Sequence, residues 1–200
     1  MLIWINGPFG GGKTTTAIEL ERRLANGIVC DPEHVGYGLH QMLPANLRAD
    51  FQDLGSWRQG VHEVLDLVAR EHSGPVLIPM TVTNPQYFAE TVGRLRDDGH
   101  DVHHFCLLAE RETVLKRLRR RGYGFGLKHE QWAVDRLDDC LASLPDPAFA
   151  THIQTDGLSV SQVAETIAAQ VGLPIAPDTE GRVQARWRQY RTSVRQTRGN

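Results

Sequence analysis

No stretch of about eighteen uncharged apolar residues occurs in this 200-residue sequence, so it lacks the apolar length that a membrane-spanning helix requires. The first apolar run, residues 2–6, is short and has no basic flank, so it does not have the pattern of a secretory signal peptide. Both absences predict a cytoplasmic protein that no helix anchors in a membrane.

Cysteine is scarce, and the three that occur, Cys30, Cys106 and Cys140, have neither paired spacing nor the spacing of metal ligands. An odd number in such a pattern argues against a disulfide framework and against a cysteine-based zinc site. Two of them fall in or at the end of predicted strands, where a free cysteine behaves as a small buried apolar residue. We therefore expect a reduced protein.

Acidic residues are missing from residues 182–198, although this segment holds six of the 22 basic residues. The other residues carry 16 basic and 24 acidic side chains, a balance of −8, so an acidic body precedes a basic tail. The tail's larger apolar side chains recur at steps of four, three and four, on one side of a helix: Val183, Trp187, Tyr190 and Val194. We predict that residues 174–200 are a basic amphipathic tail that either contacts a membrane peripherally or packs on the body. We expect no nucleic-acid partner, because the body is acidic.

Short apolar runs alternate with segments of helical periodicity along the rest of the chain. Five strands are predicted, at residues 2–6, 27–30, 75–80, 102–109 and 151–155. This order is typical of an α/β fold with a five-stranded parallel sheet and helices on both faces. We assign residues 1–173 to one such domain, with a helical substrate-binding insert at 34–72 and a lid at 117–130. Ligands of these sheets bind beyond the carboxyl ends of the strands.

The segment between the first strand and the first helix matches the phosphate-binding pattern G-x-x-x-x-G-K-[ST]. Its glycines let the backbone curl so that N–H groups face phosphate oxygens, and the following helix adds its positive dipole end. We predict that Lys13 contacts the β- and γ-phosphates of ATP and that the Thr14 hydroxyl binds Mg²⁺. The predicted nucleotide-binding residues are Gly7, Pro8, Phe9, Gly10, Gly11, Gly12, Lys13, Thr14 and Thr15.

A carboxylate near this loop is needed to bind the metal or to orient an acceptor hydroxyl. The third strand and the residues after it, PVLIPMTVTN, contain no acid, whereas the second strand leads into Asp31 and Glu33. We predict that Asp31 is a metal ligand or the group that accepts the acceptor's proton. The alternative is that Asp31 is only a turn residue before Pro32.

Arginines crowd the end of the helix over residues 110–121, which leads into the glycine-rich stretch 122–126. This arrangement is typical of the lid of a small kinase, whose arginines neutralise charge on the transferring phosphoryl group. Arg117 and Arg121 lie one turn apart on one face and are our candidate catalytic arginines. The alternative is that such residues only favour the carboxyl end of a helix.

The candidate acceptor-binding residues are Asp31, Glu33, Tyr37, Trp57, Arg58 and Met80. Three of them, Tyr37, Trp57 and Arg58, lie in the helical insert. Packing in the core is the competing interpretation for these three and for Met80.

Several of these segments together resemble the tunicamycin-resistance proteins of bacteria. The resemblance rests on WINGPFGGGKT, DPEHVG, LIPMTVTNPQYF, GRLRDDGHDVHHF, KRLRRR and HIQTDGLSVSQVAETIA, and it extends from about Met1 to Asp178. It implies a fold similar to nucleoside-monophosphate, shikimate and chloramphenicol kinases, ATP binding, resistance to a nucleoside antibiotic, and membrane association through a C-terminal amphipathic segment. It also agrees with Asp31 near metal and acceptor, and with lid arginines at Arg117 and Arg121.

Three hypotheses follow. The first is an ATP- and Mg²⁺-dependent phosphotransferase that modifies a hydroxyl of tunicamycin or of a UDP-sugar-like nucleoside. The second is a protein that sequesters tunicamycin at the inner face of the membrane without turnover. The third is a kinase of a small metabolite.

Overall fold

The computed structural model describes residues 1–122, 134 and 136–179. Its centre is a sheet of five parallel strands in the order β2-β3-β1-β4-β5. The strands are β1 (Leu2–Asn6), β2 (Ile28–Val29), β3 (Val76–Pro79), β4 (Val102–Leu108) and β5 (His152–Gln154). The predicted α/β class and five-stranded parallel sheet are therefore confirmed.

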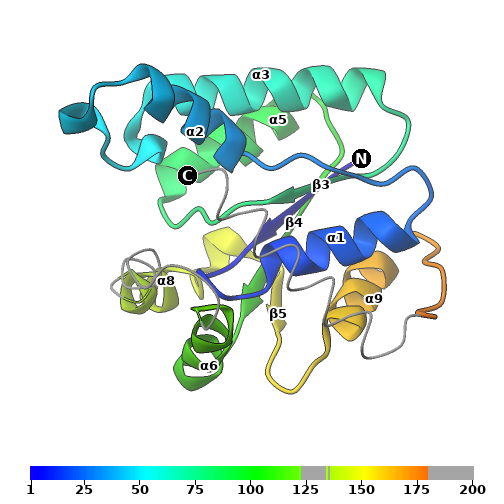
Figure 1. Cartoon of the computed structure of the whole chain (residues 1–200). Helices are drawn as coiled ribbons and strands as arrows, with labels where there is room; N and C mark the ends of the chain where they lie inside the picture. Colours follow the sequence, from blue (N-terminus) through cyan, green and yellow to red (C-terminus); the bar gives the residue numbers. More distant parts are fainter. Residues whose placement is uncertain (123–133, 135, 180–200) are drawn as a thin grey trace.

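Helices cover both faces of this sheet (Figure 1). One face is covered by α1 (Lys13–Arg23) and α9 (Val160–Gln170), and the other by α3 (Gly55–Glu71), α5 (Arg94–Asp97) and α8 (Leu137–Ser143). Leu2 and Trp4 of β1 pack on the α3 side, whereas Ile3 and Ile5 pack on the α1 side. Alternate side chains of a strand point to opposite faces, so a strand that is apolar throughout builds both cores.

The helical insert consists of α2 (Glu33–Met42), two short 3₁₀ turns, η1 (Ala45–Leu47) and η2 (Phe51–Asp53), and α3. Phe51 lies between the two helices, with its ring centre 5.5 Å from that of Trp57. A Cβ atom on Gly36 would lie 2.5 Å from the Phe51 ring, so α2 approaches Phe51 this closely because residue 36 is glycine.

A continuous helical element made of three parts follows Asn84. These are α4 (Pro85–Phe88), a π-helical segment η3 (Ala89–Gly93), and α5. Asn84 caps its start by accepting hydrogen bonds from the N–H groups of Gln86 and Tyr87. The remaining elements are α6 (Arg111–Gly122) and a 3₁₀ turn η4 (Pro147–Phe149). Within the described residues, no helix combines the length and the apolar character that crossing a membrane would require.

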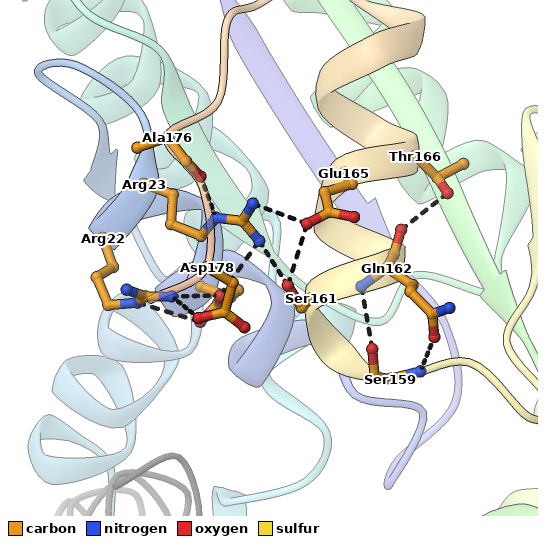
Figure 2. Close-up of polar contacts among 10 residues, drawn as sticks. Arg22, Arg23, Ser159, Ser161, Gln162, Glu165, Thr166, Ala176 and Asp178 are labelled. Atoms are coloured by element: carbon orange, nitrogen blue, oxygen red, sulfur yellow. Dashed lines mark hydrogen bonds and ion pairs between the residues drawn. The ribbon is translucent and has the colours of Figure 1, made fainter. Parts of the chain in front are cut away.

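The chain after α9 runs back over the end of α1, where a network of ion pairs holds it (Figure 2). Arg23 donates from Nε to the Ala176 carbonyl at 2.7 Å, and its guanidinium also binds Glu165 of α9 at 2.8 Å. Arg22 binds the Asp178 carboxylate at 2.9 Å. Residues 174–178, which we assign to the tail from the sequence, are therefore bound to the body. The rest of the tail, residues 180–200, lies outside the described residues.

Two truncations should separate this bound segment from the basic tail. Removal of residues 180–200 should leave the melting temperature within about 2 °C, because none of the Figure 2 contacts is lost. Removal of residues 173–200 should lower it by about 5–10 °C, because the buried Arg23 guanidinium loses a carbonyl acceptor and Leu173 and Ile175 leave the core. Differential scanning calorimetry measures both, and equal losses would contradict this division.

Candidate functional site

The candidate site begins where β1 ends, at the loop that leads into α1. Gly10 and Gly12 have φ angles of +77° and +98°, in the left-handed region that favours glycine. A Cβ atom on Gly10 would also lie 2.8 Å from Cγ of Leu118, so α6 can pack against the loop only because this residue is glycine. Gly12 is the N-cap of α1 and provides no side-chain cap hydrogen bond. A curled loop at such a helix start presents N–H groups to an anion.

Lys13 begins α1 with its side chain folded over the same loop. Its Nζ donates to the Pro8 carbonyl at 3.1 Å and lies 5.4 Å from the centre of the Phe9 ring. Only 8% of Lys13 is exposed. A buried ammonium in this loop is a group of the kind that forms charge-assisted hydrogen bonds with phosphate oxygens, and its contact with a nucleotide stays a prediction.

Asp31 follows β2, at the same edge of the sheet. Its Oδ1 accepts a hydrogen bond of 3.0 Å from the Glu33 N–H, which is the turn geometry that the competing interpretation predicts. Burial raises the pKa of Asp31 to about 6, and the Glu33 carboxylate adds to the rise. The charges of His34 and Lys13 oppose that rise. Asp31 is therefore a turn residue that also titrates near neutrality within the field of Lys13.

Glu33 and Tyr37 form a pair one turn apart on α2. The Tyr37 hydroxyl donates to Oε2 of Glu33 at 2.9 Å, and both side chains are partly exposed. Burial and the neighbouring Glu33 carboxylate raise the pKa of Tyr37, so its hydroxyl stays protonated. The pair places a carboxylate and a phenol beside Asp31, and contact with an acceptor stays a prediction.

Trp57 and Met80 are almost fully buried, at 0% and 2% exposure. The Trp57 ring donates from Nε1 to the Pro32 carbonyl at 3.0 Å, so it supports the turn that carries Asp31. Burial to this degree agrees with the packing alternative for both residues. Arg58, in contrast, is partly exposed, lies 4.4 Å from the centre of the Tyr87 ring, and forms an ion pair with Glu90.

Replacement of Trp57 by phenylalanine tests its supporting role. The variant keeps most of the buried ring but leaves the Pro32 carbonyl without its indole donor. We expect a loss of about 1–2 kcal/mol in the free energy of unfolding, measured by urea titration, and an unchanged affinity for Mg·ATP. A large loss of nucleotide affinity at unchanged stability would contradict this role.

Arg117 lies on α6 against the phosphate loop. Its guanidinium donates to the Gly11 carbonyl at 3.3 Å and to Oγ1 and the carbonyl of Thr155 at 3.1 and 2.9 Å. Burial lowers the pKa of Arg117. In this arrangement Arg117 joins α6, the phosphate loop and the end of β5, and a contact with a phosphoryl group stays a prediction. The side chain of Arg121 and lid residues 123–130 lie outside the described part of the chain.

Sequence reasoning missed two buried polar residues beside the loop, Asn6 and Thr81. Asn6 is fully buried at the end of β1, and Thr81 is 4% exposed after β3. The available signal was a polar residue directly after an apolar strand run, at the edge where ligands of parallel sheets bind.

The residues present fit a nucleotide and its metal. Gly12 leaves the start of α1 without a side-chain cap, and Lys13 is a buried cation in the same loop. No group of three or more His, Cys, Asp or Glu side chains among the described residues forms a ready metal site. Mg²⁺ prefers oxygen ligands and commonly takes only one or two from the protein, with the rest from phosphates and water. Thr14 and Asp31 supply oxygens of these types.

Comparison with known proteins agrees with this geometry. The profile of a family described as an AAA domain matches residues 2–147. Comparison with curated proteins found no significant match. The structure of the Deinococcus radiodurans tunicamycin resistance protein is 38% identical, with a TM-score of 0.74 over 88% of this chain and 98% of that one.

More distant structures share the fold. An APS kinase of Mycobacterium tuberculosis, in complex with AMPPNP and APS, has a TM-score of 0.56 at 17% identity, over 86% of this chain and 96% of that one. A shikimate kinase of Acinetobacter baumannii, in complex with shikimate, has a TM-score of 0.54 at 20% identity, over 85% and 92%. The 38% identity extends over nearly the whole length of the Deinococcus protein, and both the fold and the phosphate loop are of the P-loop kinase-like type. This chain therefore belongs to the family of tunicamycin resistance proteins.

Proposed function

We propose that this protein is an ATP-dependent phosphotransferase that modifies a hydroxyl of tunicamycin or of a UDP-sugar-like nucleoside and so confers tunicamycin resistance. The proposal is supported by the phosphate loop with its buried Lys13, by Asp31 after β2, which β3 separates from β1 in the sheet, and by the identity with a tunicamycin resistance protein.

In the proposed reaction, Mg·ATP supplies the phosphoryl group. The bond between the γ-phosphorus and its bridging oxygen breaks, and a bond to the acceptor oxygen forms. Lys13 and the loop N–H groups balance the negative charge on the phosphates. The Asp31 carboxylate accepts the proton of the acceptor hydroxyl, and Arg117 keeps the loop in place through the Gly11 carbonyl.

The feature that carries the proposal is the buried carboxylate of Asp31 after β2, on which the charge of Lys13 acts. A surface turn aspartate has a pKa of about 4, whereas burial raises the pKa of Asp31 to about 6. A carboxylate with a pKa near 6 accepts a proton more readily than an ordinary one and is still largely ionised at pH 7. A binding protein has no evident need for such a group beside its phosphate loop.

The test is incubation of the full chain with Mg·ATP and tunicamycin, followed by mass spectrometry of the drug. We expect a mass gain of one phosphoryl group that accumulates over many turnovers. Unmodified drug with ATP consumption would exclude tunicamycin as acceptor. A parallel assay with small metabolic alcohols would then show whether the protein is a metabolite kinase.

One observation favours a second candidate function, sequestration of tunicamycin without turnover. The residues after β3, Met80 to Asn84, contain no carboxylate, although this is the strand next to β1 in the sheet. Carboxylates hold the metal and orient the acceptor in phosphoryl transfer. With fewer of them, the site would bind the nucleotide as a structural ligand and would not transfer its phosphoryl group. This candidate predicts one bound drug per chain and protection of the target in proportion to the amount of protein.

We also propose that residues 180–200 bring the protein to the cytoplasmic face of an anionic membrane. The support is their sequence, with six arginines around an apolar stripe. Cosedimentation with vesicles that contain phosphatidylglycerol should capture the full chain at low salt and release it at high salt. A chain that ends at residue 179 should stay in the supernatant, and equal binding of both would contradict this role.

A further inference from the structure

The first residue of the phosphate loop, Gly7, is held on both sides of its backbone by two side chains to which no role is otherwise assigned. Its N–H donates to Oδ1 of Asn6 at 2.8 Å, and its carbonyl accepts from Oγ1 of Thr81 at 2.8 Å. Asn6 and Thr81 come from the ends of β1 and β3, 75 residues apart in the sequence, and both are buried.

Asn6 uses its whole carboxamide in these contacts. Besides accepting from Gly7, Oδ1 accepts from the Val82 N–H at 3.0 Å, and Nδ2 donates to the Val82 carbonyl at 2.8 Å. The side chain thus pairs with both the N–H and the carbonyl of Val82, as a residue of a neighbouring strand would. It continues the contact between β1 and β3 past the Met80 N–H, which donates to the Ile5 carbonyl. Only a side chain that carries both a donor and an acceptor at this length can do so.

The backbone conformation at Gly7 is also restricted by its surroundings. Its φ angle is +146°, and a Cβ atom there would lie 2.7 Å from the Leu107 carbonyl oxygen on β4. The loop therefore leaves the sheet at a point where β1, β3 and β4 all touch it. The other N–H groups of the loop come after Gly7 in the chain. A change in the backbone orientation at Gly7 would therefore move all of them relative to the phosphates.

We propose that Asn6 and Thr81 are positioning residues that set the direction of the phosphate loop, with Thr81 occupying the strand end at which this chain has no carboxylate. Neither touches the nucleotide, and each acts through the Gly7 peptide. The inference rests on the proposed nucleotide binding. It predicts that loss of the Thr81 hydroxyl weakens Mg·ATP binding, whereas loss of an equally buried threonine hydroxyl elsewhere does not.

Thr91 provides the matched control. It is fully buried, and its Oγ1 donates at 2.8 Å to the Tyr87 carbonyl, so Thr91→Val removes the same kind of hydrogen bond outside the loop. The test compares Thr81→Val, Thr81→Ser and Thr91→Val in the full chain, by calorimetric titration with Mg·ATP and by the melting temperature without nucleotide.

We expect Thr81→Val to weaken the binding of Mg·ATP about tenfold, Thr81→Ser to restore it to within about twofold of the wild type, and Thr91→Val to leave it unchanged while lowering the melting temperature comparably. Asn6→Asp, which places an oxygen against the Val82 carbonyl, should also weaken binding about tenfold. Thr81→Ala replaces Thr81→Val if the latter does not fold.

Two results overturn the inference. One is wild-type affinity in folded Thr81→Val or Thr81→Ala, and the other is an equal loss in Thr91→Val. A wild-type chain that does not bind Mg·ATP at all would instead refute the proposed function, so the two failures are distinguishable.

Discussion

Asp31→Asn is expected to lower turnover about 100- to 10,000-fold while leaving the affinity for Mg·ATP within about threefold of the wild type. The substitution removes the proton acceptor, and loss of a general base has effects of this size. It keeps Oδ1, which accepts the hydrogen bond of the Glu33 N–H, so the turn should be preserved. The phosphate loop is contributed by other residues, and nucleotide binding is therefore the internal control.

A second aspartate in a similar turn serves as the control for Asp31→Asn. It shows whether the loss of a turn carboxylate by itself lowers turnover. Asp146 precedes a proline, as Asp31 does, and accepts the N–H of Ala148 two residues later at 2.8 Å. Asp146 is the N-cap of η4 and is exposed. Asp146→Asn should retain full turnover. If Asp31→Asn also turned over at the wild-type rate, Asp31 would not be the proton acceptor.

The pH dependence of the wild type gives an independent measurement of the same group. Since burial raises the pKa of Asp31 to about 6 in the unliganded protein, kcat/KM should fall as the pH drops through 6, whereas the residual activity of Asp31→Asn should lack that limb.

The contribution of Asp31 to the free energy of unfolding should have the opposite pH dependence, and it should be larger at low pH. The folded protein holds the Asp31 proton more tightly than the unfolded chain, so this contribution is fully present below about pH 3.8 and is lost as the pH rises through 6. At pH 8 the asparagine variant should exceed the wild type by about 2 kcal/mol in urea unfolding, with the difference vanishing near pH 4.

Lys13→Met is expected to abolish turnover and to weaken Mg·ATP binding at least about 100-fold, while the protein without nucleotide keeps or gains stability. Lys13 is 8% exposed, and its Nζ donates to the Pro8 carbonyl and lies over the Phe9 ring. Methionine fills similar space without a buried charge. The phosphates lose a charge-assisted hydrogen bond, which in a water-poor site is worth more than at a surface.

The experiment combines calorimetric titration with Mg·ATP and thermal unfolding. Lys116→Met, on the exposed side of α6, is the control for loss of one positive charge and should bind normally. Because the charge of Lys13 lowers the pKa of Asp31, NMR titration should also find that pKa higher in Lys13→Met. Unchanged affinity for Mg·ATP would contradict the assignment of the loop.

The sequence by itself determined the strand and helix order and the phosphate loop. Both depend on local signals, because the apolar runs of buried strands and the glycine spacing before Lys13 and Thr14 can be recognised within a few residues. The position of Asp31 also followed, since a residue directly after a parallel strand must lie at the ligand edge.

Only the tertiary structure decided which groups the remaining candidates contact. The sequence shows Trp57 only as an aromatic residue of the insert. In the structure it donates to the carbonyl of Pro32, 25 residues away, and so supports the turn that carries Asp31. Arg117 binds the Gly11 carbonyl 106 residues away, and Thr81 binds Gly7 74 residues away. Residues 174–178 similarly belong to the body because Arg22 and Arg23 of α1 bind them.

The physical reason is the range of the interactions. Periodicity and turn chemistry act over a few residues, so they can be read along the chain. A buried side chain must find a hydrogen-bond partner, and which partner it finds depends on the strands and helices that the fold brings together. The phosphate loop can thus be recognised from eight consecutive residues. The contacts that hold it in place form only when β1, β3, β4 and α6 pack together.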